Sequence, residues 1–277
     1  MQELLIEPGR AEKNYWRDLW RYRELFYFLA WRDILVRYKQ TVIGVAWAVI
    51  RPLLMTVIFT IFAGKVAGLK SPAGVPHALL VMAAMLPWQF FSTAMTEASN
   101  SLTGNANLIS KVYFPRLVVP AGAVITSFVD FLITFGLMAV TMLCFRFVPD
   151  WHLIFLPLFV LLAFGAAFGI GLWLCALNVE YRDFRYIIPF IVQFGIYVSP
   201  VIYTSADIKA KLGETFARFY ALNPMAGVID GFQWSLLAGK TDLDWQIVLT
   251  SVIVVIFLLV TGIWYFRKME RTFADVI

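Results

Sequence analysis

The sequence predicts an all-α protein that crosses a membrane several times. Of its 277 residues, 61% are hydrophobic and only 15% are charged, against about 25% charged in an average soluble domain. A soluble core of this length cannot bury so much apolar surface, whereas a bilayer solvates it. The mean hydropathy of +0.76 agrees. This composition excludes a soluble enzyme, and it also excludes a disordered chain, which would be poor in aromatic and aliphatic residues.

Six apolar runs are predicted to be spanning helices, since a span needs about 20 mostly apolar residues. They are 42–64, 77–95, 117–145, 153–179, 186–203 and 245–266. The third and fourth are the clearest, while the fifth contains Pro189 and Pro200, which shorten or kink a helix. The chain therefore divides into an N-terminal region, 1–41, and a six-span domain, 42–277.

The Lys and Arg residues are distributed unevenly between the two sides of this topology. Six spans place both termini and the loops near 96–116 and 180–185 on one side, which carries sixteen of the 23 basic residues. Because cytoplasmic loops are enriched in Lys and Arg, we expect a cytoplasmic (inner) membrane protein with both termini in the cytoplasm. The net charge of +5 then reflects topology and attraction to membrane lipid, and it needs no nucleic-acid partner.

An amphipathic helix is predicted over 12–33, within the N-terminal region. Apolar residues recur there at spacings of three and four, with charged residues on another face. The candidate interface residues are Tyr15, Trp16, Leu19, Trp20, Tyr22 and Phe26. A basic, aromatic-rich helix is typical of the membrane interface. It either anchors the chain only or also frames a cleft for a cytoplasmic partner.

The segment 204–244 is longer than a connector on the outer side needs to be. Its pattern predicts two short helices, 206–222 and 225–237, separated by Asn223-Pro224. Both are too short and too polar to span, so we expect them to lie on or in the outer leaflet. A gate or lid is an economical use of such a segment.

The sequence contains no pattern typical of a catalytic or metal site. His77 and His152 stand alone beside span starts. Gly239-Lys240-Thr241 resembles the end of a phosphate-binding loop, but Trp234 occupies the position where that loop needs its first glycine. We therefore expect no cofactor, no metal and no enzyme activity in this chain, and energy supplied by an ion gradient or by a partner.

Two ionisable residues fall inside predicted spans. Arg51 lies near the middle of the first span and Asp130 lies deep within the third. Such residues mark either a structural pairing or an ion pathway. Pairing with each other or with polar neighbours, an ion relay, and a place near a subunit interface all remain open.

Aromatic residues lie in the spans or at their ends, and ring faces stack on the apolar faces of sugars. The candidates for a substrate path are Trp47, Phe59, Phe62, Trp88, Phe90, Phe91, Trp173, Tyr197 and Tyr203. The alternative is the aromatic belt found at the interface of most membrane proteins.

Five segments resemble one known family in order along nearly the whole chain. They are RDILVRYKQTVIGVAWAVIRP (32–52), LPWQFFS (86–92), NANLISKVYFPR (105–116), LNVEYRDFRY (177–186) and YALNPMAGVIDGFQW (220–234). This set is similar to the permease subunit of ABC-2 type polysaccharide exporters, which move O-antigen, capsular polysaccharide or teichoic acid. Arg51 departs from the family pattern, which has an uncharged amide before the proline.

The resemblance implies an ABC-2 (type V) exporter fold and a homodimer that binds two copies of a cytoplasmic ATPase, which would hold ATP and Mg²⁺. It implies that a lipid-linked polysaccharide passes between the two permeases. It further implies a coupling helix within 99–112 and an external gate within 204–244. The coupling residues would be Asn100, Asn105, Asn107, Lys111, Glu180, Arg182, Asp183 and Arg185, and the gate residues Tyr220, Asn223, Pro224, Asp230 and Trp234.

Three alternatives remain open at the level of sequence. The first is a small-molecule or drug exporter of the same broad type. The second is a membrane-embedded glycosyl or acyl transferase, which would need an acid–base pair or a metal site at a membrane face. The third is a passive scaffold.

Overall fold

The computed structural model describes residues 15–39, 44–66, 68, 71–112 and 114–273, and every regular element in these ranges is helical. The α-helices are α1 (Tyr15–Arg21), α2 (Arg23–Lys39), α3 (Gly44–Ile61), α4 (His77–Gly104), α5 (Ala106–Lys111), α6 (Val118–Cys144), α7 (Leu156–Glu180), α8 (Phe184–Val198), α9 (Ser205–Tyr220), α10 (Pro224–Leu236) and α11 (Trp245–Met269). A π-helical turn, η2 (Phe62–Val66), extends α3, and a 3₁₀ turn, η3 (Trp151–Phe155), precedes α7. The all-α prediction is confirmed.

Five helices of the described ranges are long and apolar enough to cross a membrane. They are Ala46–Lys65, His77–Gly104, Val118–Cys144, Trp151–Glu180 and Trp245–Met269. The predicted fifth span corresponds to α8, which is apolar but has only 15 residues. At 1.5 Å per residue it is about 22 Å long, short of the roughly 30 Å of a hydrocarbon core. The structure therefore supports five spans by length and leaves the sixth as a prediction.

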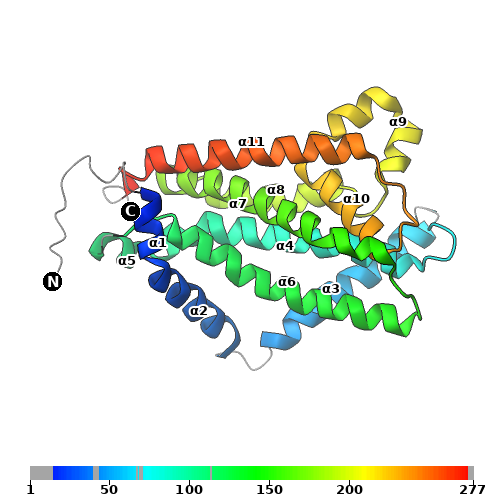
Figure 1. The fold of residues 1–277 in the computed structure, drawn as a ribbon, viewed down its shortest axis with the longest axis horizontal. Helices are drawn as coiled ribbons and strands as arrows, with labels where there is room; N and C mark the ends of the chain where they lie inside the picture. Colours follow the sequence, from blue (N-terminus) through cyan, green and yellow to red (C-terminus); the bar gives the residue numbers. More distant parts are fainter. Residues whose placement is uncertain (1–14, 40–43, 67, 69–70, 113, 274–277) are drawn as a thin grey trace.

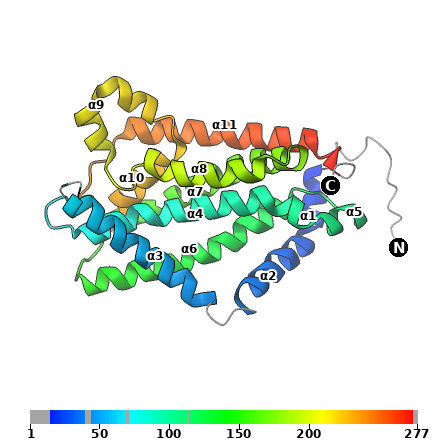
Figure 2. The same cartoon turned by 180° about the vertical axis from the view of Figure 1, so that it is seen from behind.

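The long helices run side by side, so the molecule has two distinct ends (Figures 1 and 2). At one end lie α1, α5, the α7–α8 turn and the last turn of α11; we call it the terminal end, because the described chain both begins and finishes there. At the other lie α9 and residues 71–76, which precede α4; we call it the α9 end. This grouping matches the two sides expected from the basic residues.

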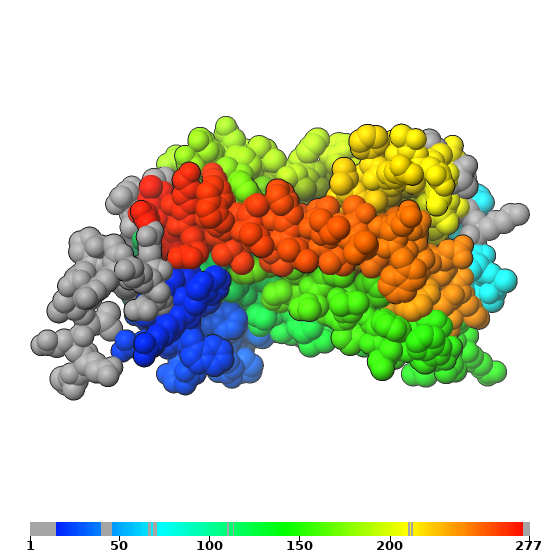
Figure 3. Space-filling model, turned by 45° about the horizontal axis from the view of Figure 1, so that its top comes forward, coloured from blue at the N-terminus to red at the C-terminus, as the bar shows by residue number. Residues whose placement is uncertain are grey.

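Helix α4 is the centre of the bundle. In its most apolar stretch 78% of the residues are buried, against 17% for α3 and 28% for α11. Leu79, Met82, Leu86 and Met95 are almost completely buried, and α3, α6, α7, α8 and α10 all pack against α4. Helix α11 lies along the surface for its whole length (Figure 3).

The N-terminal amphipathic segment is two helices instead of one. The break lies at Tyr22, and α2 continues to Lys39, six residues past the predicted end; residues 12–14 lie outside the described ranges. The predicted apolar face is confirmed, since Tyr15 and Leu29 are buried and Leu19, Tyr22 and Phe26 pack against the same cluster. Trp16 and Trp20 are exposed. Helix α2 then packs against α6 and lies beside it in the bundle (Figure 1).

The segment after α8 forms two helices, as predicted, but they have different environments. Helix α9 is largely exposed and kinked at Gly213, whose φ is +83°. Helix α10 packs against α4, α7 and α11 and is buried in the bundle, while its position in the outer leaflet stays a prediction. Glycines permit this approach, because a Cβ at Gly231 would lie 2.1 Å from the Phe159 ring.

Candidate functional site

The terminal end exposes most of the residues predicted to couple the chain to a partner. Helix α5 and the α7–α8 turn both lie there (Figure 1). The exposed coupling candidates are Asn107, Lys111, Glu180, Arg182, Asp183 and Arg185. They form a polar surface of mixed charge, and Ile109 anchors α5 by packing into a buried cluster.

Two other coupling candidates, Asn100 and Asn105, form hydrogen bonds between helices. Helix α4 continues to Gly104, so Asn100 belongs to it and not to a separate coupling helix. Asn100 donates to the Thr96 carbonyl (3.0 Å) and accepts a bond from Asn178 of α7 (3.0 Å). Asn105 accepts from Arg32 of α2 (2.9 Å) and donates to the Ser101 carbonyl (2.9 Å). These amides hold neighbouring helices together, and only α5 projects as a short separate helix.

A polar cluster joins α2, α4 and α6. Asp130 lies at the middle of α6, and Arg37 of α2 donates to its Oδ2 at 2.5 Å. The same guanidinium bonds Glu97 of α4 at 2.6 Å, and the Tyr38 hydroxyl also donates to Asp130. Arg51 is exposed on α3 and is not the partner of Asp130. Sequence reasoning missed Arg37, Tyr38 and Glu97, because they lie 33 to 93 positions away from Asp130.

The structure sorts the aromatic path candidates into three groups. Trp88, Phe90 and Phe91 are at most 5% exposed and pack in the core, where they stabilise the bundle. Trp173 stacks on Tyr265 of α11 and donates to Thr261, while Phe59 is half-buried and Tyr203 donates to the Tyr197 carbonyl. Trp47, Phe62 and Tyr197 present exposed rings on α3, η2 and α8.

The predicted gate residues connect α8, α9 and α10 at the α9 end. Asn223 caps α10 by accepting from Met225 N (3.0 Å), and its amide donates to Ser199 after α8 (3.0 Å). Pro224 takes the first helical position, where its missing N–H costs nothing. The Trp234 ring packs edge-on against His152, and Tyr220 is buried beside Tyr203.

Asp230 is the buried acidic residue of this gate region. It is 5% exposed on α10, and burial raises its pKa to about 7, against the opposing effect of the nearby Ser205 hydroxyl and amide. Asp244 lies near enough to add a smaller rise. The carboxyl thus lies between the start of α9 and the start of α11.

The described residues contain no group of three or more metal-ligating side chains. Gly239 adopts a φ of +68° and packs against the His152 ring, so the segment that resembles a phosphate loop is a turn after α10. His152 Nδ1 lies 3.7 Å from Asp150. Taken together, the candidate sites provide binding surfaces and helix junctions. Their described residues contain no nucleophile paired with a base.

Comparison with known proteins agrees with this arrangement. The family model described as "ABC-2 type transporter" matches residues 24–237. The chain is 27% identical over 262 residues to the O-antigen export system permease protein RfbA of Myxococcus xanthus, covering 94% of this chain and 98% of that protein. It is 26% identical over 247 residues to the protein of the same name from Klebsiella pneumoniae, covering 89% and 92%. The matched region contains α3 to α10 and almost all of α2, so this chain belongs to the ABC-2 type transporter family.

Proposed function

We propose that this chain is the membrane subunit of an ATP-driven exporter, and that two copies form the channel for a lipid-linked polysaccharide of the O-antigen class. The observation that carries the proposal is the match to O-antigen export permeases along 89–94% of the chain. A match of that length includes both ends of the bundle and not one motif alone. The chain itself moves the substrate and makes no covalent change to it.

The terminal end supports the docking of a cytoplasmic ATPase. It carries α5 and the exposed α7–α8 turn, and the basic residues of the sequence favour this side as the cytoplasmic one. ATP and Mg²⁺ are bound by the partner ATPase in this proposal. Closure of two ATPase subunits on ATP would push on α5, and the force would reach α4 through the Gly104–Asn105 junction.

The least buried helices support a channel between two copies. Helices α3 and α8 flank α4 on the face seen in Figure 2, and both expose large apolar side chains. Trp47, Phe62 and Tyr197 expose their rings on α3, η2 and α8, where rings of two protomers would line one passage. An aromatic lining binds the apolar faces of sugars.

Co-purification tests the proposal. The chain is isolated from its native cells in mild detergent, and the associated proteins and ATPase activity are measured. We expect a stoichiometric ATPase, and loss of the chain should make a lipid-linked glycan accumulate inside the cell. An ATPase without glycan accumulation would favour the small-molecule exporter, and a chain that purifies without any ATPase would contradict the proposal.

Replacement of α5 tests the docking surface separately. Exchanging 106–111 for a Gly/Ser linker of equal length should leave the chain in the membrane and abolish ATPase association. The matched control exchanges 206–211 of α9, which is of equal length at the other end. Equal ATPase recovery from both variants would show that α5 is not the docking element.

A further inference from the structure

A cavity of about 1060 Å³ opens at the terminal end, between α1, the segment from α5 to α6, and the end of α11. Its volume is at the upper end of the roughly 300–1,000 Å³ typical of small-molecule sites. The exposed α3–α8 face assigned to the channel contributes no lining residue. No catalytic, coupling or gate role assigned above requires a cavity at this place.

The lining is strongly basic. Five cationic side chains face two carboxylates, those of Asp18 and Glu270. The cations are Lys111, Arg116, Arg267, Lys268 and Arg271. Such an excess of positive charge in a concave site attracts anions.

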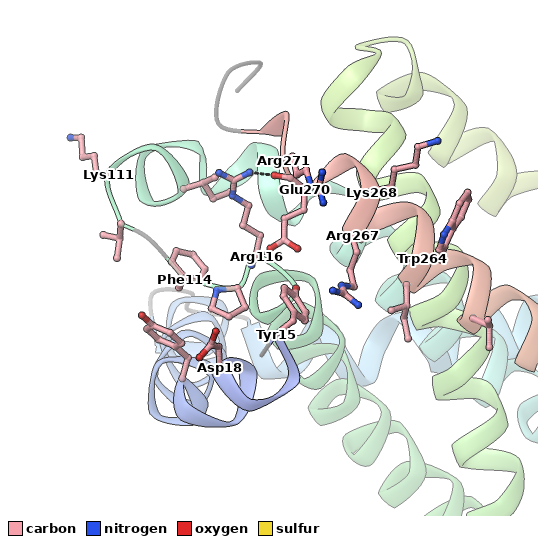
Figure 4. A pocket seen from close by; sticks show the side chains of 16 residues that line it. Tyr15, Asp18, Lys111, Phe114, Arg116, Trp264, Arg267, Lys268, Glu270 and Arg271 are labelled. Atoms are coloured by element: carbon pink, nitrogen blue, oxygen red, sulfur yellow. Dashed lines mark hydrogen bonds between the residues drawn. The ribbon is translucent and has the colours of Figure 1, made fainter. Parts of the chain in front are cut away.

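The centre of the cavity is held in place by interactions that leave positive charge available. Arg116 donates its backbone N–H to the Glu270 carboxylate at 2.7 Å and its guanidinium to the Glu270 carbonyl. Arg267 stacks over the Tyr15 ring at 4.5 Å, so its charge is not neutralised by that contact. Figure 4 shows Arg116, Arg267 and Glu270 grouped at the centre, with Lys111 and Lys268 pointing outward on opposite sides.

The Tyr15 hydroxyl and the Glu270 carboxyl lie together at the buried edge of the cavity. The hydroxyl is buried and makes no well-formed hydrogen bond, although the Glu270 carboxyl and the Leu117 backbone lie close enough to interact with it. Burial raises the pKa of both the tyrosine and the carboxyl. These two groups close the inner edge of the cavity, and its positive charge comes from the surrounding Lys and Arg side chains.

One wall of the cavity is part of the exposed apolar surface of α11. Val260, Ile263 and Trp264 line it, and exposed apolar residues continue along the same helix at Ile253 and Phe257. The spacing of three and four residues makes this a continuous stripe. A free aqueous anion would gain nothing by contact with such an apolar stripe, whereas an acyl chain would pack along it.

We propose that this cavity binds the phosphate headgroup of an anionic phospholipid, with an acyl chain lying along the α11 stripe. The lipid would join α1 to α11 at the terminal end, beside the α5 docking surface. The inference does not rest on the exporter proposal, because it needs only the cavity and a bilayer.

Lipid retention by the full-length chain tests the proposal. The protein is placed in nanodiscs of phosphatidylcholine with or without phosphatidylglycerol, and retained lipids are counted by native mass spectrometry. Arg267→Gln/Arg271→Gln should bind phosphatidylglycerol about 25-fold more weakly, since each Lys or Arg near an anionic lipid surface contributes about a factor of five in affinity. Phosphatidylcholine retention should not change. The matched control, Lys65→Gln/Lys211→Gln, removes two exposed charges elsewhere and should leave retention unchanged.

A second variant predicts the opposite sign. Glu270→Gln keeps an acceptor for the Arg116 N–H and removes a negative charge, so it should retain more phosphatidylglycerol than the parent. The proposal is overturned if neither variant differs from the control. It is also overturned if inorganic pyrophosphate binds in phosphatidylcholine discs and is lost in Arg267→Gln/Arg271→Gln, or if these variants lose a partner protein while keeping the lipid.

Discussion

At the scale of single residues, Arg37 of α2 links two other helices of the bundle. Its guanidinium joins Asp130 of α6 to Glu97 of α4, and Asp130 also accepts from Tyr38. A charge at mid-span is costly unless it is paired. Arg37 therefore fixes the end of α2 against the spans, and it explains how Asp130 is tolerated without Arg51.

Removing this charge should destabilise the protein. Arg37→Met leaves two carboxylates without their shared cation, and such losses cost several kcal/mol when fully buried. Because these side chains are 27–46% exposed, we expect about 1–3 kcal/mol, measured by thermal unfolding in detergent. Arg23→Met on the same helix, where the side chain is exposed, should cost under about 0.5 kcal/mol.

A double variant separates the pairing from a general effect of the substitution. Asp130→Asn in the Arg37→Met background should recover part of the loss, because one unpaired carboxylate is removed. If the two single substitutions simply add, Arg37 and Asp130 do not interact and the proposed role of the cluster is wrong.

Asp230 makes a pH-dependent prediction. Its pKa of about 7 in the folded protein lies above the ordinary 3.8, so the folded state binds the proton more tightly. Its stabilising contribution is then complete below about pH 4 and is lost as the pH rises to about 7. Asp230→Asn should remove this dependence and unfold several degrees higher than the parent at pH 8, with little difference at pH 4.

The control for this prediction is Asp242→Asn, an exposed acid at the same end. Thermal unfolding of both variants from pH 4 to 8 isolates the contribution of Asp230 from that of other groups. If the unfolding temperatures of the parent and of Asp230→Asn differ by the same amount at every pH, the pKa of the Asp230 carboxyl is not raised in the folded protein.

At the scale of elements, α7 and α11 meet through glycines. A Cβ at Gly169 would lie 2.9 Å from the backbone of Leu258 and Leu259, and one at Gly262 would lie 2.5 Å from the Gly169 carbonyl. Small residues on facing surfaces let membrane helices approach closely. Backbone atoms cannot move aside as a flexible side chain can.

Gly169→Ala should therefore cost about 1–3 kcal/mol, as overpacking typically does. The matched control is Gly136→Ala on α6, where the added methyl group meets no atom within 4 Å. That variant should unfold at or slightly above the parent temperature, because alanine favours a helix. Equal unfolding temperatures for both variants would show that α7 and α11 are farther apart than described.

The elements also show which features the sequence could predict. The long uninterrupted runs of α6, α7 and α11 were predicted within three residues at each end, because an apolar run of this length pairs all of its backbone N–H and C=O groups in lipid by forming one helix. The end of α4 was missed, since Thr96, Asn100 and Asn105 look like a loop until their bonds to neighbouring carbonyls are seen. The burial of α10 was missed because the close approach at Gly227 and Gly231 is a tertiary property.

The candidate site was predictable to a smaller degree. Charge counts placed α5 and the α7–α8 turn together, because the basic residues of a membrane protein report on sidedness without knowledge of packing. The same method counted Arg37 as one more basic residue of the N-terminal side. Its partner lies 93 positions away, and no spacing rule reaches that far.

At the scale of the whole molecule, the exposed faces differ in what they predict about assembly. Ile58 of α3, Tyr197 of α8 and Phe257 of α11 are 56%, 62% and 64% exposed, so exposure alone does not choose between them. The proposed channel requires a second copy on the α3–α8 face, and the proposed lipid occupies the α11 face. The two proposals therefore predict that one of these equally apolar surfaces contacts a second copy of the chain and that the other contacts lipid.

Cross-linking in membranes distinguishes these faces. In a Cys144→Ser background, with Cys175 buried, Ile58→Cys/Tyr197→Cys should give a covalent dimer with a bifunctional maleimide. Phe257→Cys, matched in exposure, should stay monomeric because lipid covers it. A dimer from Phe257→Cys and none from the other variant would move the subunit interface to α11, and the channel would then have to lie away from the rings of Trp47, Phe62 and Tyr197.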